Sequence, residues 1–381
     1  MIIILNYLGR SALVWLISLL LGCSLLRDDP PPPVASAELE AIISGQAILG
    51  HEVSPEELPD LDLFALTPEM ASFAQKAVRH AEGSFAKVRA LHYALLLPES
   101  EGGRGIVYDA YATRTPGVAF QERRVNCLSF SLLYVAMAQH LKLNAKINEV
   151  ETPPTWNLRD KDTFFLMRHV NVKIPLRERW ISPLQSDEAV VDLEMGRYKP
   201  SYIQRYISAE LVAAQFYNNR GMELAAEGNI NEAFLYLRKA LAEDDQQSYI
   251  WNNFASLYLK KNLQREAELI YQHGLRLNPN DLTIMTNLAG FYRKNGNPEK
   301  AAKFSKLAQQ YRQSNPYYQY ALALAAFDEK GYRNALLYVK RALEREQNEP
   351  RFYQLAADVY TQLGEFDSAE AMMKKHKKLS K

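Results

Sequence analysis

The sequence predicts two unlike folded parts behind an N-terminal export signal: a middle part in which a buried helix precedes strands, and a C-terminal half of repeated helices. Three observations support this prediction: an apolar run at residues 1–22, a helix-then-strand pattern from 127 to 193, and a period of 34 residues after position 221. The chain has 381 residues, 48% apolar and 23% charged, which excludes wholesale disorder. With 45 basic and 44 acidic residues, its net charge of +1 argues against a nucleic-acid binder.

Residues 1–22 are predicted to be a signal peptide, because an apolar stretch ends there in a small residue. The run Leu20-Leu21-Gly22-Cys23 resembles a bacterial lipoprotein signal. This resemblance implies that Cys23 is acylated on the periplasmic side of a Gram-negative cell envelope, and Ser24 after it favours the outer membrane. The alternative is an uncleaved transmembrane anchor, for which residues 2–22 are just long enough.

Residues 23–38 are predicted to be a tether, because four consecutive prolines from Pro30 form a stiff spacer. The chain has only two cysteines, Cys23 and Cys127, which excludes a disulfide scaffold and a zinc site built on several thiolates. There is no H-E-x-x-H motif, and the glycine-rich loop 102–105 lacks the Lys-Ser/Thr of a phosphate-binding loop. We therefore expect no metal, no nucleotide and no other cofactor.

A candidate nucleophile lies at the start of the middle helix. Residues 73–97 already show helical spacing, with Thr67 and Pro68 as a start signal. Further on, Asn126 is a good N-cap for a buried helix over residues 128–141, so Cys127 falls in the first turn. The backbone N–H groups and the helix dipole there favour a thiolate, the form that attacks. Alternatively, Cys127 is a small buried hydrophobic residue.

A base and a residue that orients it follow on predicted strands. In the strand at residues 163–174, His169 lies on the polar face, opposite to valines. The strand at residues 189–193 carries Asp192 inside an apolar run, where a carboxylate needs a partner such as a His N–H. The oxyanion donor is left open between the Cys127 backbone N–H and the side chain of Gln121.

The same segments resemble the transglutaminase-like superfamily in their local sequence: RRVNC at 123–127, RHVNV at 168–172 and VVD at 190–192. The resemblance covers roughly residues 65–205 and implies a papain-like α+β fold in which a helix packs on an antiparallel sheet. With the helices that precede it, this domain is predicted over residues 39–208. It also implies roles: Cys127 as nucleophile, His169 as general base and acid, and Asp192 as the residue that fixes the imidazole.

Small residues recur with a fixed period of 34 residues in the C-terminal half. They are expected where the two helices of a repeat approach closely. One series is Ala233, Ala267, Ala301, Ala335 and Ala369, with further small residues at Gly221, Ala255, Ala289, Ala323 and Ala357, and at Ala240, Gly274, Ala308 and Ala342. Tight turns between paired helices are expected at Gly228, Asn262, Gly296 and Gly364.

This pattern resembles the tetratricopeptide repeat, a helix–turn–helix unit whose consensus is matched by Trp251, Tyr258, Ala267, Tyr271 and Pro279. The resemblance implies an all-α solenoid of five repeats over residues 212–381, with a concave groove that binds a protein or peptide partner. The groove is expected to include Asn218, Asn252, Thr286, Tyr320 and Gln354, followed one place later by Asn219, Asn253 and Asn287. These asparagines either bind a peptide backbone or are simply common at that position.

Together these features predict an exported, membrane-anchored protein that transfers acyl groups through a thioester on Cys127. Water as acceptor would make it a peptidase or amidase, and an amine would make it a transglutaminase. The alternative is a catalytically inactive scaffold for assembly in the cell envelope. The sequence leaves open the substrate, the acceptor, the ligand of the repeats and the oligomeric state.

Overall fold

The computed structural model describes residues 33–151, 155–156, 164–165, 168–176, 187–193 and 202–380. The predicted signal peptide, Cys23 and most of the predicted tether lie outside the described residues. The last tether residues, 36–38, already belong to helix α2 (Ser36–Ile43). Within the part of the chain that is described, no helix combines the length and the apolar character needed to cross a membrane.

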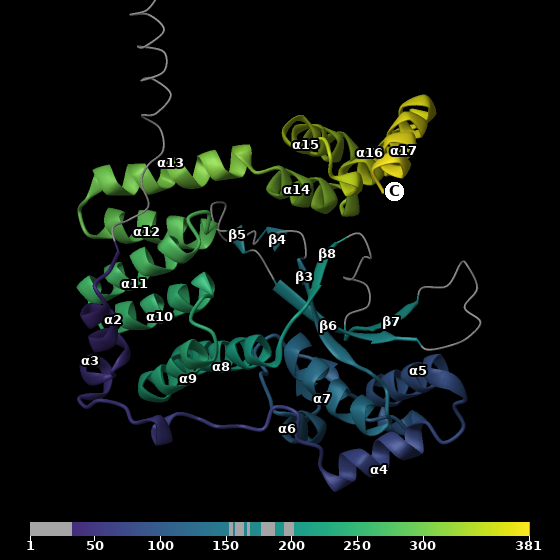
Figure 1. Cartoon of the computed structure of the whole chain (residues 1–381), viewed down its shortest axis with the longest axis horizontal. Coiled ribbons are helices and arrows are strands. Elements are labelled where there is room, and N and C mark those ends of the chain that lie inside the picture. Colours follow the sequence, from purple (N-terminus) through teal and green to yellow (C-terminus); the bar gives the residue numbers. More distant parts are fainter. Residues whose placement is uncertain are drawn as a thin grey trace, which may run out of the picture.

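The N-terminal helices α2 and α3 (Gln46–Leu49) lie beside the repeated helices (Figure 1). The Tyr258 hydroxyl donates to the carbonyl oxygen of Ile42 over 2.5 Å, and the Arg238 side chain donates to that of Ile43 over 3.0 Å. This segment was expected to lead into the 39–208 domain, yet its contacts connect it to the C-terminal half.

The helical region before Cys127 contains more breaks than the spacing predicts. Thr67 caps its first helix as expected, accepting a hydrogen bond from the Met70 N–H. The predicted helix at residues 73–97 is interrupted at 78–82, because the chain turns there and Gly83 has a positive φ of 79°. The elements are α4 (Pro68–Ala77), α5 (Gly83–Leu96), α6 (Pro116–Glu122) and the short 3₁₀ helices η1 (Pro55–Glu57) and η2 (Glu99–Glu101).

A four-stranded antiparallel sheet follows, with the strand order β7-β6-β3-β8. Helix α7 (Cys127–His140) runs along this sheet beneath β6 (Figure 1). The four strands are β3 (Lys146–Glu151), β6 (Arg168–Pro175), β7 (Glu188–Val191) and β8 (Ile203–Tyr206). Two small pairs accompany them, β1 (Val107–Tyr108) with β2 (Arg124–Val125), and β4 (Thr155–Trp156) with β5 (Phe164–Phe165).

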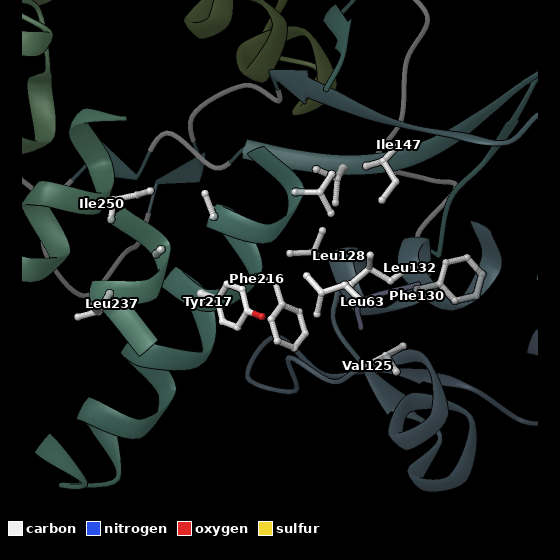
Figure 2. Packing of buried hydrophobic residues seen from close by; sticks show 14 of the residues in the cluster. Leu63, Val125, Leu128, Phe130, Leu132, Ile147, Phe216, Tyr217, Leu237 and Ile250 are labelled. Atoms are coloured by element: carbon white, nitrogen blue, oxygen red, sulfur yellow. The ribbon is translucent and has the colours of Figure 1, made fainter. Parts of the chain in front are cut away.

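The core between α7 and the sheet continues without interruption into the repeats. Helix α7 is apolar on nearly all sides because it is covered on nearly all sides, and its residues 128–138 are buried. Figure 2 shows Phe216 and Tyr217 of the first repeat between Leu128 of α7 and Leu237 of the next helix. Burial of this shared apolar surface holds the two parts together.

Five helix pairs form the C-terminal half. The predicted small residues are buried where helices meet. A Cβ added to Gly221 would lie 2.8 Å from Cγ of Leu237 in the paired helix. One added to Gly274 would lie 3.1 Å from Cβ of Trp251 in its paired helix and 2.8 Å from Cδ1 of Ile284 in the next pair. The pairs are α8 (Ala209–Ala226) with α9 (Ile230–Glu243), α10 (Ser248–Lys260) with α11 (Gln264–Leu277), α12 (Leu282–Lys294) with α13 (Pro298–Ser314), α14 (Pro316–Asp328) with α15 (Tyr332–Arg345), and α16 (Pro350–Leu363) with α17 (Phe366–Leu379).

The turn inside each pair contains one residue with a left-handed backbone. The four positions expected from the sequence, Gly228, Asn262, Gly296 and Gly364, all have φ between 60° and 88°. The remaining pair places Lys330 at the same position, with φ 61°. A lysine gives no turn signal, so this member of the series was not predicted.

The apolar core of the array divides between α13 and α14. The first apolar cluster ends in α13 at Ala308, and a second cluster begins in α14. This second cluster contains Val150 of β3 and Tyr202, which precedes β8, together with residues of α14 to α16. The last two helix pairs therefore pack against the sheet (Figure 1).

Candidate functional site

The first turn of α7 is held by buried hydrogen bonds. Asn126 caps the helix as predicted, since its side-chain oxygen accepts from the Ser129 N–H over 2.9 Å. Its side-chain N–H donates to the Thr113 hydroxyl over 2.7 Å. Cys127 is the first residue of the helix, and its half-buried side chain contains a free thiol group. The cap thus fixes the position from which this thiol reaches solvent.

His169 and Asp192 form a buried pair at the edge of the sheet. Nε2 of His169, on β6, lies 2.6 Å from Oδ2 of Asp192, the residue that follows β7. Their exposed fractions are 8% and 1%. The two strands are neighbours and pair Val172 with Val191, so this end of β7 lies beside the first half of β6.

The environment of His169 favours its charged form. Burial alone lowers the pKa of its imidazole, but hydrogen bonds to Asp192 and to the Cys127 side chain outweigh that effect and raise the pKa to about 10. The charged form of the imidazole is therefore favoured by its place between a carboxylate and a sulfur atom. The structure thus brings the three predicted site residues together. Gln121 lies in α6 with an exposed side chain.

A second histidine, His92 of α5, lies behind this group. Its Nε2 is 3.1 Å from the backbone oxygen of Asp192, and its ring packs against Phe130 and Tyr134 of α7. Burial lowers the pKa of His92, so it is neutral and can donate to that carbonyl oxygen. The sequence did not predict that His92 belongs to the site. No local signal relates this helix to a residue 100 positions later.

Buried amide side chains extend the network across the sheet. The Asn171 amide lies 3.4 Å from Oδ2 of Asp192, and Asn148 donates to Asn171 over 2.9 Å and to Gln204 over 3.2 Å. Asn171 was visible in the sequence as the next residue on the His169 face, but its role was not predicted. Over the described ranges, no group of three or more His, Cys, Asp or Glu side chains is arranged to hold a metal ion.

The prediction of which residues line a groove along the first helices of the repeats is partly wrong. Asn218, Asn252 and Tyr320 are buried, so they do not face an open groove. Asn253 donates to Asn218, and Asn287 donates to Asn252, each over 2.8 Å. These asparagines join successive repeats, because their position lies between neighbouring first helices. The half-buried members of the predicted set are Asn219, Asn253, Thr286, Asn287 and Gln354.

The tetratricopeptide repeat family model matches residues 214–247, 248–281 and 350–381. The C-terminal part therefore contains tetratricopeptide repeats, in a helical solenoid as predicted. The matches cover the first, second and fifth helix pairs. The other two pairs flank the point where the core divides.

Three solved structures illustrate the likeness. The PilF protein of Pseudomonas aeruginosa is 21% identical, with a TM-score of 0.27 over 45% of this chain and 78% of that one. MamA of Desulfovibrio magneticus is 14% identical, with a TM-score of 0.25 over 45% and 96%. YrrB, described as a tetratricopeptide repeat protein with an unusual peptide-binding site, is 17% identical, with a TM-score of 0.24 over 44% and 86%. No curated protein matches the chain.

Proposed function

We propose that the chain is a cysteine-dependent acyl-transfer enzyme of the transglutaminase-like type, joined to a repeat array that binds a protein or peptide partner. One observation carries the proposal: the buried His169–Asp192 pair, 2.6 Å between Nε2 and Oδ2, is in hydrogen-bond contact with a cysteine at a helix N-terminus. Each group has the environment that its role requires. The sulfur has a cation beside it, the imidazole has a carboxylate, and the carboxylate is buried.

The proposed chemistry follows from this arrangement. His169 takes the proton of the Cys127 thiol, and the resulting thiolate attacks the carbonyl carbon of an amide. The C–N bond breaks, and the His169 imidazolium gives its proton to the departing nitrogen, leaving a thioester on the sulfur. His169 then takes a proton from water or from an amine as that nucleophile attacks the thioester. The C–S bond breaks and either the acid or a new amide is released, which leaves the sulfur as a thiolate with the proton on His169.

The test of this site is the reaction of Cys127 with iodoacetamide at about pH 6, where a free thiol is almost entirely protonated and slow. We expect Cys127 to react at least about tenfold faster than a free thiol. His169→Ala should abolish the difference. His140→Ala is the matched control, because His140 ends the same helix and its Nε2 lies 2.9 Å from Gln75. Equal rates for Cys127 and a free thiol would exclude an activated nucleophile.

Hydrolysis and transfer are distinguished by the acceptor. A mixture of glutamine-containing peptides is incubated with the protein, with and without a fluorescent primary amine. Incorporation of the amine indicates a transferase, whereas loss of ammonia or peptide cleavage without incorporation indicates a hydrolase. Cys127→Ala must remove either product.

The second candidate is a catalytically inactive scaffold, favoured by the fact that tetratricopeptide repeats are the part a family model matches. Such repeats present surfaces for protein or peptide partners. If the protein is such a scaffold, the Cys127→Ala variant still binds a partner through its repeats, and no acyl transfer is detected with the unaltered protein. An activated Cys127 would contradict it.

The proposed location is the periplasmic side of the cell envelope, with a lipid on Cys23 holding the chain to the outer membrane. Support comes from the Leu20–Cys23 sequence and the proline-rich stretch after it. Metabolic labelling with palmitate should mark the protein, and Cys23→Ser should lose the label. An unlabelled protein that stays in the membrane would instead indicate an uncleaved anchor.

A further inference from the structure

The cap of the nucleophile helix is connected to the first helix of the repeats by a short bridge. Thr113, whose hydroxyl accepts from the Asn126 side chain over 2.7 Å, donates its own backbone N–H to Oε1 of Glu223 over 2.9 Å. Glu223 belongs to α8, so the second bond crosses from the loop before α6 into the repeat array. All three side chains are buried, with exposed fractions of 2%, 6% and 8% for Thr113, Asn126 and Glu223.

The neighbours of Thr113 strengthen the same bridge. Its predecessor Ala112 accepts the Asn126 backbone N–H over 3.1 Å, and its successor Arg114 donates a backbone N–H to the Ser129 hydroxyl over 2.6 Å. Residues 112–114 are therefore bonded to the first turn of α7 on one side and to Glu223 on the other. A displacement of Thr113 would move the cap next to Cys127.

Glu223 has the surroundings of a residue held in place. Burial raises the pKa of its carboxyl group, an effect that the hydrogen bonds from Thr113 and Arg220 oppose. Arg220 lies 3.1 Å and Arg114 3.9 Å from Oε2, so two cations face the oxygen that Thr113 does not use. The carboxylate is thus paired on both oxygens, with Thr113 and Arg114 of the loop on one side and with Arg220 of its own helix on the other.

We propose that Glu223 is a positioning residue for Cys127, acting through Thr113 and Asn126, so that the first repeat is an integral part of the nucleophile site. This inference rests on the proposed function, because it assumes that the thiolate of Cys127 depends on its alignment with His169. Glu223 does not touch a substrate. Its effect is on where the first turn of α7 holds the sulfur.

The experiment measures alkylation of Cys127 by iodoacetamide against pH in the full chain. Glu223→Met removes the acceptor while keeping the size of the side chain, and we expect the rate at about pH 6 to fall by about tenfold to a hundredfold. Glu223→Gln keeps an oxygen for the Thr113 N–H and should retain most of the rate. The matched control is Glu227→Gln, one turn later at the C-cap of α8, whose carboxylate is exposed and lies 3.6 Å from Arg220.

A second variant removes the other hydrogen bond of the bridge, the one between Thr113 and Asn126. Thr113→Val removes the hydroxyl that receives the Asn126 amide and should slow alkylation similarly. Since the two bonds act in series, the double variant with Glu223→Met should be little slower than either single variant. If Glu223→Met does not fold, Thr113→Val alone tests the inference, because a normal pH profile for that variant would overturn it.

The outcomes separate this inference from the proposed function. If the unaltered protein and Glu223→Met both react fast at about pH 6, Cys127 is activated but Glu223 has no positioning role. If Glu223→Met unfolds at a lower temperature and keeps its pH profile, its role is structural only. If the unaltered protein reacts like a free thiol, the proposed function fails and the inference fails with it.

Discussion

At the scale of single residues, the charge on His169 depends on its two polar neighbours. Burial by itself would leave this imidazole neutral, and the hydrogen bonds to Asp192 and Cys127 reverse the direction of the pKa shift. Asp192 in turn receives further contacts, from Asn171 at its carboxylate and from His92 at its carbonyl oxygen. Among the groups that do not touch the sulfur, the Asp192 carboxylate is therefore the one whose removal should lower the reactivity of Cys127 most.

The first prediction concerns Asp192→Asn. A neutral amide no longer stabilises the charged form of His169, so His169 becomes a weaker base beside the thiol, and alkylation of Cys127 at about pH 6 should slow by at least about tenfold. The rate is measured by quenching the alkylation at set times and determining the intact mass of the protein. Asp187→Asn, on an exposed residue ahead of β7, should leave it unchanged. An unaffected rate in Asp192→Asn would mean that the carboxylate does not govern the pair.

The second prediction concerns the pH dependence of stability through His92. Because its pKa in the folded protein lies below the ordinary value of 6.5, the unfolded chain binds the proton first as the pH falls. The contribution of His92 to the free energy of unfolding is therefore present above about pH 6.5 and is lost as the pH falls through the folded-state pKa.

Urea denaturation at about pH 7.5 and about pH 5.5 tests this sign. His92→Gln, which can still donate to the Asp192 carbonyl, should show a smaller loss of stability on acidification than the unaltered protein. His80→Gln on an exposed histidine is the control. A loss of equal size in the His92 variant would assign the acid sensitivity to other groups.

At the scale of the elements, the helix pairs depend on small residues at their contacts and on one left-handed residue at their turns. Both features were readable in the sequence because they recur with the period of 34 residues, except where Lys330 replaces the expected turn residue. The break between α4 and α5 was not readable, because residues 73–97 keep an apolar spacing across the turn.

The third prediction compares two glycines within helices. In Gly221→Ala the new Cβ would lie 2.8 Å from Cγ of Leu237, so α8 and α9 must separate, at a cost of about 1–3 kcal/mol in the free energy of unfolding. Gly290→Ala in α12 meets nothing within 4 Å and should stabilise by about 0.5–1 kcal/mol. Equilibrium unfolding in urea measures both. Equal effects of the two substitutions would contradict the packing argument.

Part of the candidate site was predictable from the sequence, and part of it was not. The cap at Asn126, the strand alternation around His169 and the apolar run at Asp192 are local patterns, and the predicted elements carry the three residues to one place. His92, Glu223 and Thr113 belong to contacts between distant segments, for which a single sequence has no periodic signal. The buried asparagines were misassigned because polarity alone does not separate an inter-repeat bond from an open groove.

At the scale of the whole molecule, strand β3 contacts both ends of the array. Glu149 accepts a hydrogen bond from Gln215 of α8 over 2.8 Å, and its other oxygen is paired with Arg205. The next residue, Val150, is fully buried in the cluster formed with α14 to α16. The array therefore leaves the sheet at α8 and meets it again at α14.

The fourth prediction is that Val150→Ala weakens the return contact. Removing two buried methyl groups should cost about 1–3 kcal/mol, and amide hydrogen exchange should accelerate in α14 to α16 as well as in β3. Leu337→Ala, on an exposed leucine of α15, is the control and should change neither. Faster exchange confined to β3 would show that the last repeats are stable without the sheet.

The apolar cluster shared by α7 and α8 has a practical consequence for dissection of the chain. A fragment cut at residue 208 would uncover Leu128 and its neighbours where Phe216 and Tyr217 now cover them, and the excised repeats would present the complementary surface. Exposed apolar surfaces of this kind promote aggregation. Expression trials should therefore treat the part that contains the sheet and the repeats as one inseparable folding unit, and point substitutions will be more informative than truncations.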